Sequence, residues 1–145
     1  MFKKILIPVD GSDTCSKVFE SAKEFYEKFD AKIILVHVDD STLIQNYVNY
    51  PMPNINLQVD GKARSAEIIK IAQTNLNVPD SHLIIKVLTG EPASAILDVA
   101  VQEDADLILM CTHGMGAAKR FLLGSVTNRV VHHADIPVLI IRQEK

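Results

Sequence analysis

The chain has 145 residues, of which 48% are hydrophobic and 23% are charged, and its formal net charge at pH 7 is -3. This composition is typical of a globular protein, so we expect residues 1–145 to form a single domain with its own core. The mildly acidic balance argues against a broad nucleic-acid or membrane surface, because both need clustered basic side chains.

Cysteine usage and the apolar runs indicate where the protein works. Cys15 and Cys111 are far apart and form no C-x-x-C pair, whereas a secreted disulfide scaffold carries more cysteines. The N-terminal apolar run is too short for a signal peptide, and no run approaches the length needed to span a bilayer. We therefore expect a cytoplasmic protein.

Apolar runs typical of buried strands alternate along the chain with amphipathic runs typical of helices. The first half predicts a strand over Lys3–Val9, a helix ending near Phe29 and a strand over Lys32–Val38. The apolar face of that helix carries Val18, Ala22, Phe25 and Phe29. The segment Asp39–Leu57 has no regular period, so we expect a long loop with a short helix near Leu43–Val48.

The second half continues the alternation with shorter connections. Its predicted elements are a helix over Gln58–Leu76, a strand over Leu83–Leu88, a helix from Pro92 to near Asp104, a strand over Asp106–Cys111, a glycine-bearing loop over Thr112–Phe121, a helix over Gly124–Ala134 and a strand over Pro137–Ile141. The first of these helices has an apolar stripe of Ala66, Ile69, Ala72 and Leu76. Strands joined by helices pair in parallel, so we expect an open five-stranded parallel sheet with helices on both faces, a Rossmann-like α/β fold.

Ligands of open parallel sheets bind outside the carboxyl ends of the strands, where the strand order reverses. Asp10 and Val38 stand at the ends of the first two predicted strands, and the loop from Thr112 follows the fourth. That loop contains Gly114, and Gly124-Ser125 opens the next helix. Glycines let backbone amides approach an anion, and a helix N-terminus adds free N–H groups. The spacing fits a phosphate cradle, and it also fits a simple cap on the last helix.

Four stretches of the sequence resemble the universal stress protein family: KKILIPVDGS, LVHV, TGEP and THGMGAAKRFLLGSVTNRVVHHADIPVLIIR. The resemblance covers nearly the whole chain and is weakest over residues 39–60. The family's nucleotide-binding branch carries G-x-x-G, nine residues, and then G-S/T. Gly114 and Gly124-Ser125 match that spacing, whereas Cys111 stands where the branch has its first glycine. There is neither a Walker A lysine nor a dinucleotide fingerprint after the first strand.

The resemblance implies a site for an adenine nucleotide, ATP or ADP, at the carboxyl edge of the sheet. The residues that it assigns there are Pro8, Val9, Asp10, Val38, Met110, Thr112, His113, Gly114, Gly124, Ser125 and Val126. In this arrangement Pro8–Val9 borders the adenine and ribose, Val38 contacts the adenine through its backbone, and Met110 lines the same pocket.

The same resemblance implies that Gly114 and the segment Gly124–Val126 bind the phosphates. Asp10 faces the nucleotide and can share a Mg²⁺ ion with the phosphates, although a helix-capping role for Asp10 needs no ligand. Cys111 crowds the ligand or strains the turn if a glycine is required there, and is tolerated if a small residue suffices. Between a redox-sensitive thiol and a small buried apolar residue, we favour the second role for Cys111.

These features indicate an adenine nucleotide-binding protein that acts as a regulatory or sensor module in stress adaptation, without a dedicated catalytic activity. Two alternatives stay open. One is a slow ATPase, for which only Asp10 and His113 offer a water-activating group. The other is a nucleotide-independent dimeric interaction protein, which Cys111 favours. The resemblance also implies a homodimer through the last strand, and an apolar edge at Pro137–Ile141 invites such pairing.

Overall fold

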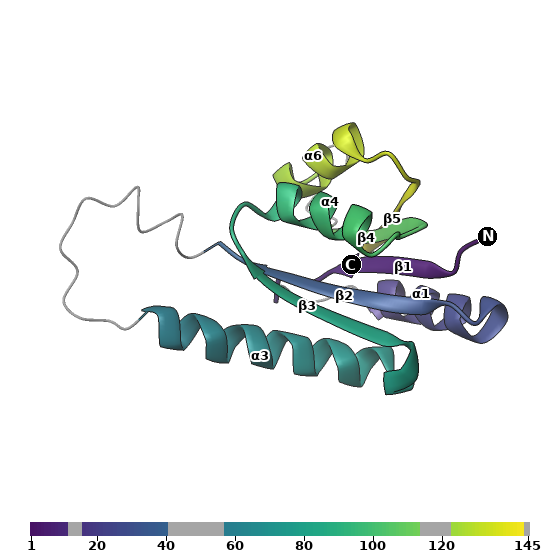
Figure 1. The fold of residues 1–145 in the computed structure, drawn as a ribbon, viewed down its shortest axis with the longest axis horizontal. Helices are drawn as coiled ribbons and strands as arrows, with labels where there is room; N and C mark the ends of the chain where they lie inside the picture. Colours follow the sequence, from purple (N-terminus) through teal and green to yellow (C-terminus); the bar gives the residue numbers. More distant parts are fainter. Residues whose placement is uncertain (12–15, 41–56, 114–122, 144–145) are drawn as a thin grey trace.

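The computed structural model describes residues 1–11, 16–40, 57–113 and 123–143 (Figure 1). Five parallel strands form one sheet in the order β3-β2-β1-β4-β5, which confirms the predicted α/β fold class. The strands are β1 Lys4–Pro8, β2 Lys32–Asp39, β3 Leu83–Thr89, β4 Leu107–His113 and β5 Val138–Gln143. The helices are α1 Ser16–Phe29, α3 Leu57–Leu76, α4 Pro92–Gln102 and α6 Ser125–His133, with a 3-10 turn at Asp80–His82.

Helices α1 and α3 cover one face of the sheet, and α4 and α6 cover the other (Figure 1). Successive strand residues alternate between the two cores: Ile5 and Ile33 pack under α1 and α3, whereas Leu6 and Ile34 pack under α4 and α6. The crossovers through α1 and α3 step along the sheet in one direction and those through α4 and α6 in the other, and right-handed crossovers of opposite direction place their helices on opposite faces. The reversal of strand order therefore produces the three-layer arrangement.

Strand β2, which lies between β3 and β1, is buried on both faces, as its apolar sequence predicts. Residues 33–37 are all buried, and only the ends of the strand reach solvent. The edge strands differ from it, because one side of each has no neighbouring strand. Ile85 and Val87 on β3 are 40% and 49% exposed, and Leu139 on β5 is 42% exposed. The alternating pattern of β3 is what an edge strand under a single helix layer requires.

Two predicted apolar faces need correction. Ala66 is exposed, and the buried face of α3 instead contains Ser65, which is only 4% exposed, together with Ile68. Successive side chains of a helix point about 100° apart. The face that contains Ile69 and Leu76 therefore also contains Ser65, and Ala66 points away from it. Phe29 is 47% exposed at the end of α1, although its ring lies 5.9 Å from that of Phe25.

Some expectations concern segments that lie outside the described residues. The predicted loop over Asp39–Leu57 falls mainly on residues 41–56, and the short helix near Leu43–Val48 falls entirely within them. At the two ends of this segment, Asp39 belongs to β2 and Leu57 to α3. Within the described ranges, no helix is both long and apolar enough to cross a membrane.

Candidate functional site

The strand order reverses between β1 and β4, which both lie at the centre of the sheet. β1 pairs with β2 on one side and with β4 on the other, and the chain steps outward from these strands in opposite directions. In such sheets the crevice outside the carboxyl ends of the two diverging strands is where ligands bind. Asp10 lies two residues after the end of β1, and Thr112–His113 ends β4. The sheet order thus brings these two predicted segments to the same edge.

Two hydrogen bonds of Val9 and the backbone conformation of Gly11 fix the turn after β1. The Val9 N–H donates to the Val36 carbonyl at 2.8 Å, and the Val9 carbonyl accepts a hydrogen bond from Nδ1 of His37, also at 2.8 Å. Gly11 has a φ of +79°, and a Cβ at this position would lie 2.7 Å from Cδ1 of Ile68 on α3. Only glycine satisfies both conditions without rearrangement. Asp10 is consequently presented at the surface on a fixed turn.

His37 is a residue of this edge that the sequence interpretation missed. It is 7% exposed and stands among the apolar residues of β2. Since a carbonyl oxygen only accepts hydrogen bonds, Nδ1 of His37 carries the proton in the bond to Val9. The signal available in the sequence was a single imidazole inside a continuous apolar strand, since a buried polar group needs a partner.

Cys111 lies inside β4, opposite Ile141 of β5. Its φ is not positive, unlike those of Asp30, Asn77 and Asp104, so a cysteine adopts this backbone without strain. The side chain is half-buried against the α1 and α3 core, and Sγ lies 3.8 Å from the Thr112 carbonyl. The predicted role of a small apolar packing residue agrees with this environment, although its burial is partial.

The two residues beside Cys111 differ from it in burial. Met110 and Thr112 are 6% and 8% exposed. Met110 belongs to the core under α4 and α6, and Val38 and Val126 pack against the same core. Three predicted site residues from β2, β4 and α6 thus converge on one apolar cluster near the carboxyl edge.

Helix α6 begins at this edge without a side-chain cap. Its N-cap is Gly124, with φ -56° and ψ 159°, and the first helical bond runs from the Asn128 N–H to the Gly124 carbonyl at 2.8 Å. Gly124 and Ser125 are exposed, and a Cβ on Gly124 would have no neighbour within 4 Å. The N–H groups of the first turn have no acceptor within the helix. The α6 N-terminus therefore offers donors and open space to an anion.

An ion pair that the sequence interpretation did not foresee joins the N-terminus of α4 to the middle of α6. Glu91 caps α4 by accepting hydrogen bonds from the N–H groups of Ala93 and Ser94 at 3.2 and 2.8 Å. The same carboxylate accepts a hydrogen bond from the Arg129 guanidinium of α6 at 2.8 Å. Hydrogen bonding with Ser94 is the main reason that the pKa of Glu91 lies below its usual value.

Part of the predicted site cannot be placed. Gly114 and the side chain of His113 lie outside the described residues. Pro8 ends β1 half-buried, and Val9 is 5% exposed beside it. No cluster of three or more potential metal ligands occurs among the described His, Cys, Asp and Glu side chains.

Comparison with known proteins identifies the family. Residues 1–142 match the universal stress protein family. A universal stress protein of Thermus aquaticus, named for its place in the QAH/OAS sulfhydrylase 3'region, is 35% identical over 98% of this chain and 100% of its own length. The structure of the hypothetical protein MJ0577 is 27% identical and superimposes with a TM-score of 0.75, covering 100% of this chain and 99% of that one.

The fold likeness extends further, to the universal stress protein from Archaeoglobus fulgidus in complex with dAMP. That structure has a TM-score of 0.68 at 21% identity and covers 97% of this chain and 99% of its own. The family match spans almost the entire sequence. The chain belongs to the universal stress protein family.

Proposed function

We propose that this chain is an adenine nucleotide-binding module, with ATP or ADP as ligand, that serves regulation or sensing in stress adaptation in the cytoplasm rather than dedicated catalysis. The observation that carries the proposal is the start of α6. Its N-cap is an exposed glycine, and among the described residues no side chain caps the helix and no atom lies within 4 Å of the glycine's Cβ position. This helix start follows the family's spacing from Gly114 to Gly124-Ser125. The bound dAMP of the Archaeoglobus fulgidus protein adds support, since that protein shares this fold.

The phosphates are expected at the α6 N-terminus. Free N–H groups and the positive end of the helix dipole stabilise an anion there, and the exposed Ser125 hydroxyl adds a further donor. Gly114 is expected to complete the cradle from the loop after β4. A Mg²⁺ ion would bridge the phosphates and the Asp10 carboxylate, since Mg²⁺ commonly takes one or two carboxylates together with phosphate oxygens.

The adenine is expected beside Val38, beyond the end of β1. The ladder between β1 and β2 ends where the Val9 N–H bonds the Val36 carbonyl. Residues two apart in a strand direct their N–H and C=O groups to the same side, so those of Val38 point past the last bond to β1. The backbone groups of the next residue, Asp39, point to the other side of the strand, toward β3. There the Asp39 carbonyl accepts a hydrogen bond from the Gly90 N–H at 3.0 Å. An adjacent backbone donor and acceptor complement the amino group and ring nitrogens of adenine.

Nucleotide binding is tested by denaturing the purified protein and chromatographing what it releases, followed by calorimetric titration with ATP in the presence and absence of Mg²⁺. Gly124→Ala is the most informative variant. The protein itself leaves room for the added Cβ, so a loss of affinity reports a ligand in that space. We expect Gly124→Ala to weaken binding about tenfold because its methyl group occupies space that the ligand needs, and Ser125→Ala to weaken it about tenfold because one hydrogen bond to a charged group is lost.

Ser81→Ala is the matched control, because Ser81 is exposed at the opposite edge of the sheet, where its hydroxyl contacts His82 at 2.9 Å. Equal affinities of the wild type and Gly124→Ala would contradict the phosphate placement. A wild type that binds no nucleotide, with binding restored by Cys111→Gly, would instead support the nucleotide-independent alternative.

A homodimer through the last strand is the second part of the proposal. β5 pairs only with β4 among the described strands, and Leu139 is 42% exposed on it. An apolar edge of this kind favours pairing with a second copy over the segment Pro137–Ile141. Sedimentation should give the mass of two chains, and Leu139→Lys should shift it to one. A wild-type mass of one chain would refute the dimer.

A further inference from the structure

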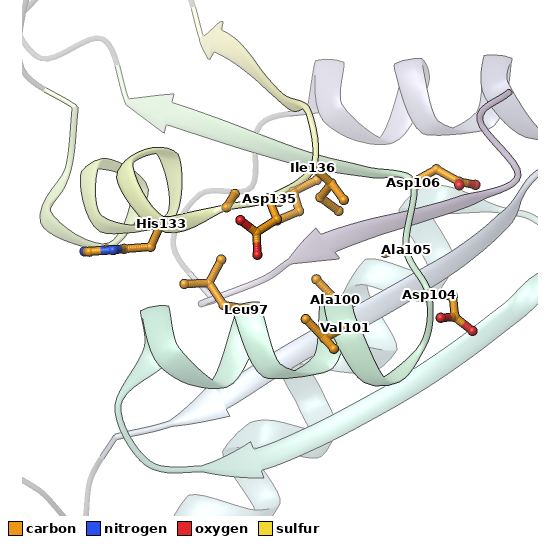
Figure 2. A pocket seen from close by; sticks show the side chains of 11 residues that line it. Leu97, Ala100, Val101, Asp104, Ala105, Asp106, His133, Asp135 and Ile136 are labelled. Carbon is orange, nitrogen blue, oxygen red and sulfur yellow. The ribbon is translucent and has the colours of Figure 1, made fainter.

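A pocket of about 400 Å³ lies at the amino edge of the sheet, between α4 and α6 (Figure 2). Its floor consists of core residues: Ala100, Ala105 and Ile108 are 7%, 6% and 0% exposed. Leu97 and Ile136, both half-buried, form its sides. A volume of this size with an apolar interior is within the range of small-molecule sites. The pocket is at the opposite edge of the sheet from the proposed nucleotide site.

The electrostatic surroundings of this pocket are negative. Helix α6 ends beside it, and its C-terminus carries the negative end of a helix dipole, whereas at the end of α4 the Lys4 ammonium donates to the Glu103 carbonyl at 2.7 Å. Asp104 and Asp135 are exposed at the rim. No lysine or arginine lines the pocket among the described residues, and His133 is its sole basic group. An anion is therefore disfavoured here and a cation favoured.

The three lining carboxylates have different roles. Oδ2 of Asp106 accepts hydrogen bonds from the backbone N–H groups of Lys3 and Lys4 at 2.7 and 2.8 Å, so this carboxylate is committed to β1. In Figure 2 the carboxylates of Asp104 and Asp106 point away from Leu97, whereas that of Asp135 lies over the α4 side of the pocket. Asp135 is thus the carboxylate placed to meet a bound group.

We propose that this pocket binds a small organic cation, with an ammonium or guanidinium group paired to Asp135 and an apolar body on the floor formed by Ala100, Ala105 and Ile108. The apolar body removes water from the floor and from Val101, which is 73% exposed at the rim. The cationic group meets Asp135 and the C-terminus of α6. This inference does not rest on nucleotide binding, since a nucleotide is an anion and its proposed site uses other residues.

The test compares two probes that share a phenylethyl body and differ in charge, phenethylammonium and 3-phenylpropionate. Each is titrated into the full-length isotope-labelled chain, and amide shifts are followed by NMR. We expect saturable shifts around Leu97, Ala100 and Ile136, with phenethylammonium binding about tenfold more tightly than the anion. Equal affinities, or shifts that do not saturate at these residues, would overturn the proposal.

Asp135→Asn separates a specific pairing from general charge attraction. It should weaken phenethylammonium binding about three- to fivefold and leave the anion unaffected or bound more tightly. Asp98→Asn is the matched control, because Asp98 is exposed on α4 and does not line the pocket. An equal loss in the two variants would refute Asp135 as the partner. Ser125→Ala should leave this binding unchanged, which keeps the result independent of the nucleotide site.

Discussion

The amino edge and the carboxyl edge of the sheet differ in how their backbone groups are satisfied. At the amino edge, side chains satisfy the backbone groups where strands begin. Oδ2 of Asp106 accepts from the N–H groups of Lys3 and Lys4 at 2.7 and 2.8 Å. The ammonium groups of Lys4 and Lys3 donate to the carbonyls of Glu103 and Phe29 at 2.7 and 2.8 Å. This edge is closed by contacts between segments more than twenty residues apart, so it contributes to stability without a ligand.

At the carboxyl edge the strands end at different heights, and a helix begins beside them. β1 stops opposite Val36 while β2 continues to Asp39, and α6 starts at Gly124 without a side-chain cap. The rigid part is the turn at Gly11, which sets the position of Asp10. The difference suggests that backbone donors and acceptors are satisfied internally at one edge and directed toward a ligand at the other.

The largest stability effect is expected from Gly11→Ala at the carboxyl edge. Alanine at a φ of +79° is strained, and its Cβ would approach Cδ1 of Ile68 to 2.7 Å. We expect a loss of about 3 kcal/mol in the free energy of unfolding, measured by urea denaturation. Gly124→Ala is the control, because its φ of -56° suits alanine and its Cβ meets no neighbour, so it should change stability by less than about 1 kcal/mol. Similar losses in both would contradict the contrast drawn between the two glycines.

The next largest loss in the free energy of unfolding is expected from Asp106→Ala at the amino edge. The substitution leaves the N–H groups of Lys3 and Lys4 without their carboxylate acceptor at the start of β1. We expect a loss of about 2 kcal/mol, because hydrogen bonds to charged groups are stronger than neutral ones but Lys3 is exposed to water. Hydrogen exchange should accelerate at Lys4 and less at Val36. Asp98→Ala, which removes an exposed carboxylate from α4, should be close to neutral, and a loss as large as that of Asp106→Ala would refute the specific role of Asp106.

The fold could be predicted from the sequence because its strongest signals are local. Continuous apolar runs such as Lys32–Val38 mark strands covered on both faces, and the alternation with helices dictates parallel pairing. The sequence interpretation was wrong about which residues of a helix face the core. Ser65 is less hydrophobic than Ala66 and yet is the buried residue of the two, because Ile68, Ile69 and Leu76 set the rotation of α3. An alanine gains too little from burial to fix the rotation of a helix.

The places of the candidate site residues within strands and helices were predictable, whereas the contacts that hold them were not. Asp10 and Val38 could be placed at strand ends, and Gly124 at a helix start, from the sequence pattern alone. The bonds that hold this edge join residues far apart in the chain, as with His37 and Val9 or Glu91 and Arg129. No local period encodes such pairs, so they emerged only with the tertiary structure.

Glu91→Gln should produce the smallest of these effects and show how firmly α4 and α6 are joined. Glutamine can still accept a hydrogen bond at the α4 N-terminus, but it loses the charge that faces Arg129 and the backbone N–H groups. We expect a loss of about 1 kcal/mol at pH 7, the usual scale for a helix cap. The folded-state pKa of Glu91 is lowered, chiefly by hydrogen bonding with Ser94, so its contribution to stability is present above the unfolded carboxyl pKa of about 4.3.

That contribution is lost as the pH falls through the lower folded-state pKa, so the stability difference between the wild type and Glu91→Gln should shrink below about pH 4. Arg129→Gln supplies the control, because it removes the ion pair and leaves the α4 cap in place. Its cost should be smaller than that of Glu91→Gln and should decline as salt is added. A difference that persists unchanged to pH 3, or an Arg129→Gln cost equal to that of Glu91→Gln, would mean that the capping bonds to Ala93 and Ser94 are not what Glu91 contributes. Confirmation would show that the Glu91 carboxylate stabilises the α4 N-terminus chiefly by capping it, and that its ion pair with Arg129 of α6 adds a smaller amount.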